Sequence, residues 1–260
     1  MIEAIVLDLD GTLLNSKKEV SHVNLQAIER CLDYGIKIII ATARPPRSVK
    51  SLLPSDLLRK CSFIYYNGAN IEDKYFFSID KSVSSEIIDY LLEQESGVKI
   101  SIESKDKWYS HQEIELLSFG VSIGPEYLEL ESMKNLEATK LLISNFSNIQ
   151  GLQDKYREKV NILITDRGSL IQIMAREVSK ENAVLILCQK YNINISKVVS
   201  FGDDYNDLGL FHECGYSVAM GNAITELKEL ATLVTYTNDN DGVAEAIEWF
   251  LNDSYSEGAS

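Results

Sequence analysis

The chain has 260 residues, of which 45% are hydrophobic and 25% charged, proportions typical of a soluble globular protein that can bury one large core or two smaller ones. Its 39 acidic and 25 basic residues give a formal net charge of −14, which opposes binding to nucleic acids and to anionic membrane surfaces. The apolar runs are too short to span a bilayer, no signal peptide is visible, and four widely spaced cysteines without a C-x-x-C pair predict reduced thiols in a cytoplasmic protein.

The first part of the chain alternates between strand and helix signals. Its strands are continuously apolar, which indicates a parallel sheet with both faces covered by helices. Ser21 is a candidate N-cap for the first helix, and Pro54 is expected to break the second. The expected strands are 2–8, 36–42 and 62–67, and the expected helices are 21–35 and 47–58.

The middle of the chain has a different pattern. In the segments GVKISIES and LIQIMA, apolar and polar residues alternate, which predicts a sheet with one solvent-exposed face. After residue 178 the alternation of apolar strands and helices resumes. We therefore predict an α/β fold with a doubly wound parallel-sheet core formed by 1–80 and 179–260, interrupted by an inserted, smaller α+β domain formed by 81–178.

Two acidic side chains interrupt the first expected strand. Asp8 and Asp10 stand in the apolar run VLDLDGTLL, where an unpaired buried carboxylate would be costly. Because side chains two residues apart on a strand point the same way, both acids can face one site. We expect that the strand ends here, where ligands bind in open parallel sheets, and that a cation lies between the acids. A simple turn at the strand end is the alternative.

Other expected strands also end in polar residues. One ends in Thr42, and another ends in Asp203, with Asn206 and Asp207 one turn later. Carboxylate oxygens suit Mg²⁺, which binds through one or two carboxylates, several waters and substrate phosphate. Lys180 begins the helix that returns to the core, and a cation beside a helix N-terminus favours the binding of phosphate oxygens. The sequence therefore predicts a site for a metal ion and a phosphoryl group.

These residues lie in motifs that follow one another in a known order. The motifs are DLDGTLL (8–14), ATAR (41–44), VSKENA (178–183) and GDDYNDLGLF (202–211), with NGA (67–69), VAMGNA (218–223) and NDNDGVAEAI (238–247) as further matches. With them the sequence resembles the haloacid dehalogenase superfamily, and within it the Cof-like sugar-phosphatase subfamily. The resemblance covers essentially the entire chain, and the inserted segment is the part least like a fixed pattern. It implies a Rossmann-like core with an inserted α/β cap.

The resemblance also implies a role for each motif residue. Asp8 would be the nucleophile that forms an aspartyl-phosphate, and Asp10 would be the general acid and base. Mg²⁺ would be held by the Asp8 carboxylate, the Asp10 backbone carbonyl and Asp203, with Asp207 acting through water. The phosphoryl oxygens would be bound by the side chains of Thr42, Lys180 and Asn206, and by backbone N–H groups near Leu9 and Ala43.

Several residues near the motifs depart from the family pattern or allow two interpretations. Where the family usually has Gly after the motif lysine, this chain has Glu181. Arg176 is expected either to balance the charge of Glu181 or to reach the substrate. Asp204 is expected to support the start of a helix rather than to bind the metal. Arg44 fits a structural salt bridge and a substrate contact equally well.

The predicted function is Mg²⁺-dependent hydrolysis of a small phosphorylated metabolite. The family resemblance implies that this metabolite is a sugar phosphate and that the cap closes over the site. Within the inserted segment, Trp108 and Tyr109 fit either a sugar-facing platform or an aromatic pair that packs in the core or lies exposed. Two alternative functions stay open. A phosphate-ligand sensor would use the same fold, although a binding module has no need of an acid–base Asp10. A sugar-phosphate mutase would pass the phosphoryl group to a second sugar.

Overall fold

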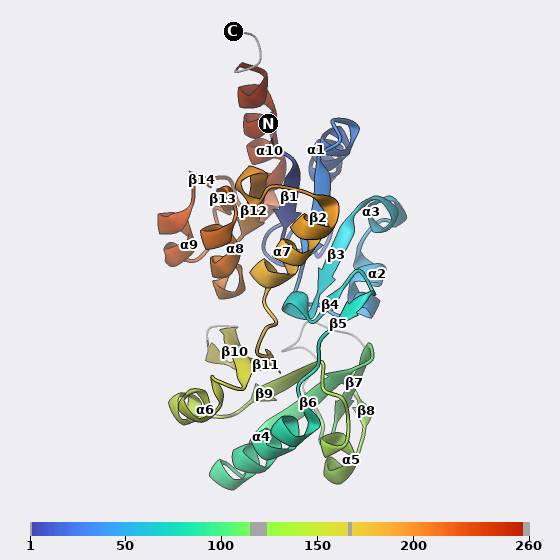
Figure 1. Cartoon of the computed structure of the whole chain (residues 1–260), viewed down its shortest axis with the longest axis vertical. Coiled ribbons are helices and arrows are strands. Elements are labelled where there is room, and N and C mark those ends of the chain that lie inside the picture. Colours follow the sequence, from blue (N-terminus) through green and yellow to red (C-terminus); the bar gives the residue numbers. More distant parts are fainter. Residues whose placement is uncertain (1, 115–123, 166–167, 257–260) are drawn as a thin grey trace. The chain divides into compact units, whose positions relative to one another are not determined.

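The protein is described by a computed structural model that covers residues 2–114, 124–165 and 168–256 (Figure 1). The chain forms two compact units, one comprising Met1–Glu72 with Ser179–Ser260 and the other comprising Asp73–Val178. We refer to them as the discontinuous unit and the inserted unit. No helix in the part of the chain that the structure describes is both long enough and apolar enough to cross a membrane.

The sheet of the discontinuous unit has the strand order β14-β13-β12-β1-β2-β3-β4-β5. Every pairing from β14 to β3 is parallel, which confirms the predicted parallel sheet, whereas β4 pairs antiparallel to β3. The strands are β1 (Ala4–Leu7), β2 (Lys37–Ala41), β3 (Ser62–Tyr65), β4 (Asn70–Ile71), β5 (Tyr75–Phe76), β12 (Val198–Gly202), β13 (Tyr216–Ala219) and β14 (Leu233–Val234).

The direction of the chain along this sheet reverses between β1 and β12. From β1 the chain proceeds to β2 and β3 on one side, and from β12 it proceeds to β13 and β14 on the other. Because such crossovers are right-handed, α1 and α8 cover opposite faces, and the sheet is doubly wound as predicted. The helices of this unit are α1 (His22–Asp33), α2 (Pro46–Leu52), α3 (Ser55–Lys60), α7 (Lys180–Tyr191), α8 (Leu208–Glu213), α9 (Thr225–Leu230) and α10 (Gly242–Ser256).

The central strands end at the same level of the sheet. Leu7, the last residue of β1, is aligned with Phe201 of β12 and with Ile40 of β2. All residues of β1 and β12 are buried, as their apolar sequences predict. The residues that follow these strands, beginning with Asp8, therefore leave the sheet together at the point where its strand order reverses, where ligands bind in open α/β sheets.

The N-cap and the helix break that the sequence predicts, at Ser21 and Pro54, are both present in the structure. The side chain of Ser21 accepts a hydrogen bond from the Asn24 N–H at 3.1 Å and caps α1. Pro54 separates α2 from α3.

All four cysteines are free thiols, and three of them are buried.

The inserted unit contains a mixed sheet with the strand order β10-β11-β9-β6-β7-β8, in which only β7 and β8 pair in parallel. Its hydrophobic core includes residues from both the sheet and the helices, such as Ile102 of β6, Ile88 of α4 and Leu152 of α6. The elements are β6 (Lys99–Ser104), β7 (Lys107–Ser110), β8 (Glu126–Tyr127), β9 (Lys140–Ser144), β10 (Val160–Thr165), β11 (Leu170–Ala175), α4 (Lys81–Gln94), α5 (Leu130–Lys134) and α6 (Ile149–Tyr156).

The predicted solvent-exposed face of this sheet is wrong for β6 and β11. The polar residues Ser101, Glu103 and Gln172, which alternate with the core residues, are buried as well. Lys140 donates to the Gln172 Oε1 at 3.1 Å, and the Gln172 amide donates to Thr165 at 3.0 Å. For Gln172, hydrogen bonds to residues of the two neighbouring strands replace those that water would make, so the alternation of residue types did not predict its burial.

Asn24 links α1 to the first turn of α10, and we expect Asn24→Ala to destabilise the protein. The buried Asn24 Oδ1 accepts a hydrogen bond from the Ala244 N–H at 2.9 Å, and an unpaired buried N–H costs about 1–3 kcal/mol. The free energy of unfolding, measured with denaturant, should fall by about that amount. Asn240→Ala, at an exposed residue of the same unit, is the control and should change it by less than about 0.5 kcal/mol. Equal effects of the two substitutions would contradict this account of Asn24.

Candidate active site

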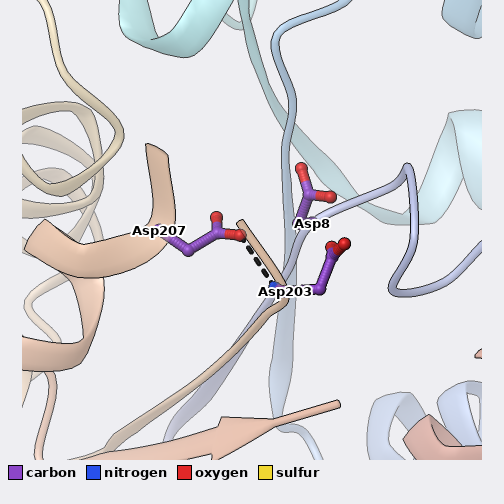
Figure 2. Close-up of side chains that lie close together, drawn as sticks. All are labelled: Asp8, Asp203 and Asp207. Carbon is purple, nitrogen blue, oxygen red and sulfur yellow. Dashed lines mark hydrogen bonds between the residues drawn. The ribbon is translucent and has the colours of Figure 1, made fainter. Parts of the chain in front are cut away.

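Three acidic side chains converge at the ends of β1 and β12 (Figure 2). Asp8 follows β1, Asp203 follows β12, and Asp207 ends the 3₁₀ turn Tyr205–Asp207. One carboxylate oxygen from each lies within 4.8 Å of the others. Asp8 and Asp207 are buried, and Asp203 is half-buried. We refer to these three residues as the aspartate triad.

The turn after β1 brings two residues against Asp203. Gly11 has a φ of +79°, and a β-carbon at this position would lie 2.1 Å from the Asp203 Oδ2, so only glycine fits here. The Thr12 hydroxyl donates to the Asp203 Oδ1 at 2.9 Å. No role was predicted for Thr12 from the sequence, although its place in the first motif, DLDGTLL, was a signal for a role at the site.

Lys180 joins two members of the triad. Its Nζ lies 2.6 Å from the Asp8 Oδ1 and 2.7 Å from the Asp207 Oδ1, and its side chain is fully buried. The second oxygen of Asp207 accepts hydrogen bonds from the backbone N–H groups of Asp203, at 3.0 Å, and Asp204, at 3.4 Å; Figure 2 marks the first of these with a dashed line. Both oxygens of Asp207 therefore already have partners within the protein.

The charges of this cluster do not balance. Three carboxylates face a single ammonium group, which leaves two negative charges when all are ionised. Burial raises the pKa of Asp8 to about 7 despite the neighbouring Lys180, and burial together with the charge of Asp8 raises the pKa of Asp203 to about 8. Although burial alone would lower the pKa of Lys180, the charges of Asp207 and Asp8 raise it. A divalent cation would balance these charges, and the carboxylate oxygens are ligands that fit it.

Asp10 does not join the triad but forms a separate ion-pair cluster. Its carboxylate receives hydrogen bonds from the Arg44 Nε at 2.5 Å and Nη2 at 2.7 Å, and from the Lys18 Nζ at 2.8 Å. Burial alone would raise the pKa of Asp10, but the hydrogen bonds and charges of Arg44 and Lys18 hold it below its ordinary value. Of the two interpretations of Arg44, a structural salt bridge and a substrate contact, the structure therefore shows the salt bridge. Nothing in the sequence pattern pointed to Lys18.

Thr42 and Asn206 lie around a third residue, Asn67. Asn67 donates its N–H to the Thr42 carbonyl at 2.8 Å, and its Oδ1 accepts from the Asn206 Nδ2 at 3.1 Å. Thr42 and Asn67 are buried. Asn67 lies in the motif NGA, one of the further family matches, but no role was predicted for it from the sequence. Leu9 and Ala43, whose N–H groups were predicted to bind phosphate, directly follow Asp8 and Thr42 in the chain.

Two asparagines hold the exit loop of the first motif in place. The Asn222 Nδ2 donates to the Gly11 carbonyl at 2.8 Å, and the Asn238 Nδ2 donates to the Leu14 carbonyl at 2.9 Å. The Asn238 N–H also donates to the Asn222 side chain at 3.0 Å. These residues come from the matches VAMGNA and NDNDGVAEAI, so those segments support the loop that carries Asp10.

The structure also places the residues for which the sequence left the role open. Arg176 pairs with Glu158 at 2.9 Å, a partner that neither expectation for this residue named. The carboxylate of Glu181 lies against Gly209 of α8. Asp204 accepts a hydrogen bond from the Tyr205 N–H at 2.9 Å and caps the 3₁₀ turn, as expected of an acid at a helix start. In β7, Trp108 is buried and Tyr109 is half-buried.

A family model described as haloacid dehalogenase-like hydrolase matches residues 5–247. The chain belongs to this family. The hydrolase is 29% identical to the 5-amino-6-(5-phospho-D-ribitylamino)uracil phosphatase YwtE of Bacillus subtilis, over 98% of this chain and 100% of that protein. Its fold matches a haloacid dehalogenase-like hydrolase from B. subtilis, with a TM-score of 0.83, 25% identity, and coverage of 95% and 99% of the two chains.

The Thermotoga maritima protein TM0651 is also similar, with a TM-score of 0.79, 28% identity, and coverage of 95% of this chain and 97% of that protein. These matches span both the parallel-sheet unit and the inserted unit. The predicted family and fold class are therefore confirmed. The hydrolase is accordingly an enzyme of the phosphoric monoester hydrolase class.

The unbalanced charge of the triad predicts how stability depends on pH when no metal is bound. In the unfolded chain Asp8 and Asp203 lose their protons near pH 4, whereas in the folded protein they keep them until about pH 7 and 8. Between these values the folded state binds more protons, so stability falls as the pH rises. In chelator, the free energy of unfolding should decrease by about 2 kcal/mol or more between pH 5 and pH 8.

This dependence is measured by denaturant unfolding of the hydrolase in buffers that contain a chelator. Asp203→Asn removes one of the two titrating groups and should make the dependence shallower. A wild-type stability that increases over this interval would contradict the charge imbalance inferred for the triad.

Proposed function

We propose that this hydrolase removes the phosphoryl group from small phosphorylated metabolites, using Mg²⁺ and a transient aspartyl-phosphate on Asp8. The observation that carries the proposal is the aspartate triad, in which Asp8 and Asp207 are buried and one lysine faces three carboxylates. A phosphate-binding site with an excess of negative charge requires a cation before an anionic substrate can approach. The topological switch point of the sheet is also the position where such folds bind their ligands.

The residues that would hold Mg²⁺ are Asp8, Asp203 and the backbone carbonyl of Asp10. Asp207 would act through water, because its two oxygens already accept hydrogen bonds from Lys180 and from backbone N–H groups. When bound, the cation reduces the repulsion between the Asp8 carboxylate and the phosphate dianion and polarises the phosphoryl oxygens. Oxygen ligands and the small number of free carboxylate positions favour Mg²⁺ among the common divalent cations.

In the proposed reaction, a carboxylate oxygen of Asp8 attacks phosphorus, and the bond between phosphorus and the leaving-group oxygen breaks. Asp10 gives a proton to that oxygen and later takes one from the water that hydrolyses the aspartyl-phosphate. The ion pairs with Arg44 and Lys18 keep Asp10 ionised, which suits the second role. The first role requires Asp10 to take up a proton, and therefore requires these ion pairs to weaken when substrate binds.

The phosphoryl oxygens would be bound by Lys180, Thr42 and Asn206, with backbone N–H groups near Leu9 and Ala43. Lys180 is suited to this role because it is held rigidly between Asp8 and Asp207 and begins α7, where the helix dipole favours an anion. Phosphoryl transfer depends chiefly on positioning and on charge stabilisation, which a rigid set of donors supplies.

For the substrate we propose a sugar phosphate or the phosphate ester of a related polyhydroxylated metabolite, so that the leaving group is a sugar or polyol hydroxyl. We place this activity in the cytoplasm. The similar B. subtilis protein is named for a substrate that carries a phosphorylated ribityl chain, which supports this class. The four free thiols suit a reducing compartment. Phosphate release from a panel of sugar phosphates and phosphorylated ribityl compounds tests the proposal.

Asp8→Asn should abolish hydrolysis of an aryl phosphate in Mg²⁺, with a loss of at least about 10³-fold in kcat, because the amide cannot form the acyl-phosphate. Asp56→Asn is the matched control: Asp56 is exposed and its carboxylate pairs with Arg59 on the same helix, α3, so its removal should leave the rate unchanged. Wild-type rates in Asp8→Asn would refute the mechanism. Mg²⁺-dependent ligand binding without any turnover by the wild type would indicate a sensor, and transfer to an added acceptor sugar would indicate a mutase.

The metal site is tested by titrating Mg²⁺ into chelator-treated enzyme. Asp203→Asn should raise the Mg²⁺ concentration needed for half-maximal activity by at least about tenfold, because it removes an anionic ligand. Asp204→Asn changes the neighbouring carboxylate, which caps the 3₁₀ turn, and should change this concentration by less than about threefold. Full activity of the wild type in excess chelator would contradict the metal requirement.

A further inference from the structure

The turn that follows β3 has an unusual backbone. Tyr66, Asn67 and Gly68 have successive φ angles of 54°, 56° and 113°, in the left-handed region that a bulky residue such as tyrosine rarely adopts. A β-carbon on Gly68 would lie 2.4 Å from the Ser179 carbonyl oxygen, so the turn lies directly against the residue that precedes Lys180. Backbone strain of this kind persists where the surrounding structure enforces it, and it is frequent at binding sites.

Hydrogen bonds connect this turn to residues that are proposed to bind the phosphoryl group. The Asn67 N–H donates to the Thr42 carbonyl at 2.8 Å, and the Tyr66 N–H donates to the Arg44 carbonyl at 3.1 Å. The Asn67 Oδ1 accepts from the Asn206 Nδ2 at 3.1 Å. Asn67 therefore contacts both Thr42 and Asn206, which are far apart in the sequence.

The side chain of Asn67 carries a donor that lacks an acceptor. Asn67 is fully buried, and its Nδ2 has no hydrogen-bond partner among the residues that the structure describes. Buried polar groups are nearly always paired, because an unpaired donor loses its hydrogen bond to water without a replacement. The buried Thr42 hydroxyl accepts from the Arg44 N–H at 3.1 Å, which leaves its own hydrogen to donate. Two buried donors therefore suit a ligand that is rich in acceptor oxygens.

We propose that Asn67 is a further phosphoryl-binding residue, whose Nδ2 donates to a non-bridging oxygen of the bound phosphoryl group while its Oδ1 orients the amide of Asn206. The inference rests on the proposed phosphatase function. A neutral amide adds a donor here without adding a charge that would pair with the aspartate triad. Asparagine also suits the backbone, since it tolerates a positive φ better than most residues that have a side chain.

The test compares Asn67→Gly with Asn192→Gly. Glycine tolerates the φ of 56° at residue 67, so this variant loses the side chain without new backbone strain. Asn192 has nearly the same φ, 55°, but is exposed at the C-terminal end of α7. In saturating Mg²⁺, Asn67→Gly should raise the inhibition constant of inorganic phosphate at least about tenfold, the effect of losing one hydrogen bond to a charged group. The control should change it by less than about twofold.

A second variant separates binding from a structural role. Asn67→Asp has nearly the same shape and keeps an acceptor for Asn206, but replaces the Nδ2 donor with an anionic oxygen. It should weaken phosphate binding more than Asn67→Gly does, because a carboxylate repels the phosphoryl oxygens. If both variants keep the inhibition constant within about twofold of wild type while their melting temperatures fall, Asn67 is only structural and the inference is wrong.

Calorimetric binding of inorganic phosphate to the Mg²⁺-loaded protein separates this inference from the proposed function. If the wild type binds phosphate without hydrolysing any substrate, and Asn67→Gly weakens that binding tenfold, the role of Asn67 stands and the hydrolytic function fails. If the wild type hydrolyses phosphate esters and both Asn67 variants bind phosphate as tightly as it does, only the inference fails. A wild type that neither binds nor hydrolyses overturns both.

Discussion

The buried ammonium group of Lys180 holds together two carboxylates that would otherwise repel each other. It lies 2.6 Å from Asp8 and 2.7 Å from Asp207 with no exposure to water, and breaking a buried pair of this kind costs about 3–5 kcal/mol. One positive charge nevertheless cannot balance three carboxylates. The ion pairs therefore hold the geometry of the site, but the site keeps an excess of negative charge. This excess favours the binding of a cation, which an anionic substrate needs in order to approach.

The position of Asp203 is maintained by contacts from the loop after β1. Thr12 donates to its carboxylate, Gly11 leaves room for it, and two asparagines from the C-terminal part of the chain hold the loop in place. Each of these contacts joins segments that are far apart in the sequence. The geometry of the aspartate triad thus depends on the packing of the whole parallel-sheet unit rather than on any single motif.

Asp10 lies in a different electrostatic environment from the triad, although only one residue separates it from Asp8. Arg44 and Lys18 stabilise its charged form, whereas burial destabilises the charged form of Asp8. The two carboxylates therefore have opposite pKa shifts, and the proposed roles, Asp8 as nucleophile and Asp10 as proton-transfer group, require a cation beside Asp8 and weaker ion pairs at Asp10. Both acids follow β1 at the same edge of the sheet. The direction of the strand therefore does not determine the difference between their pKa shifts.

The sequence by itself determined the parallel sheet and the residues at its strand ends, because hydrophobic periodicity and the position of polar residues in a strand are local properties. It also predicted that Asp8, Asp203, Asp207 and Lys180 would meet, since the ends of parallel strands share one edge. Only the tertiary structure decided the partners: Arg44 with Asp10, Arg176 with Glu158, and Asn67 with Asn206. The reason is physical. A long side chain can reach several neighbours, and which of them it pairs with depends on the packing that brings them together. Asn67 and Asn206 are 139 positions apart, so no local pattern in the sequence indicates their contact.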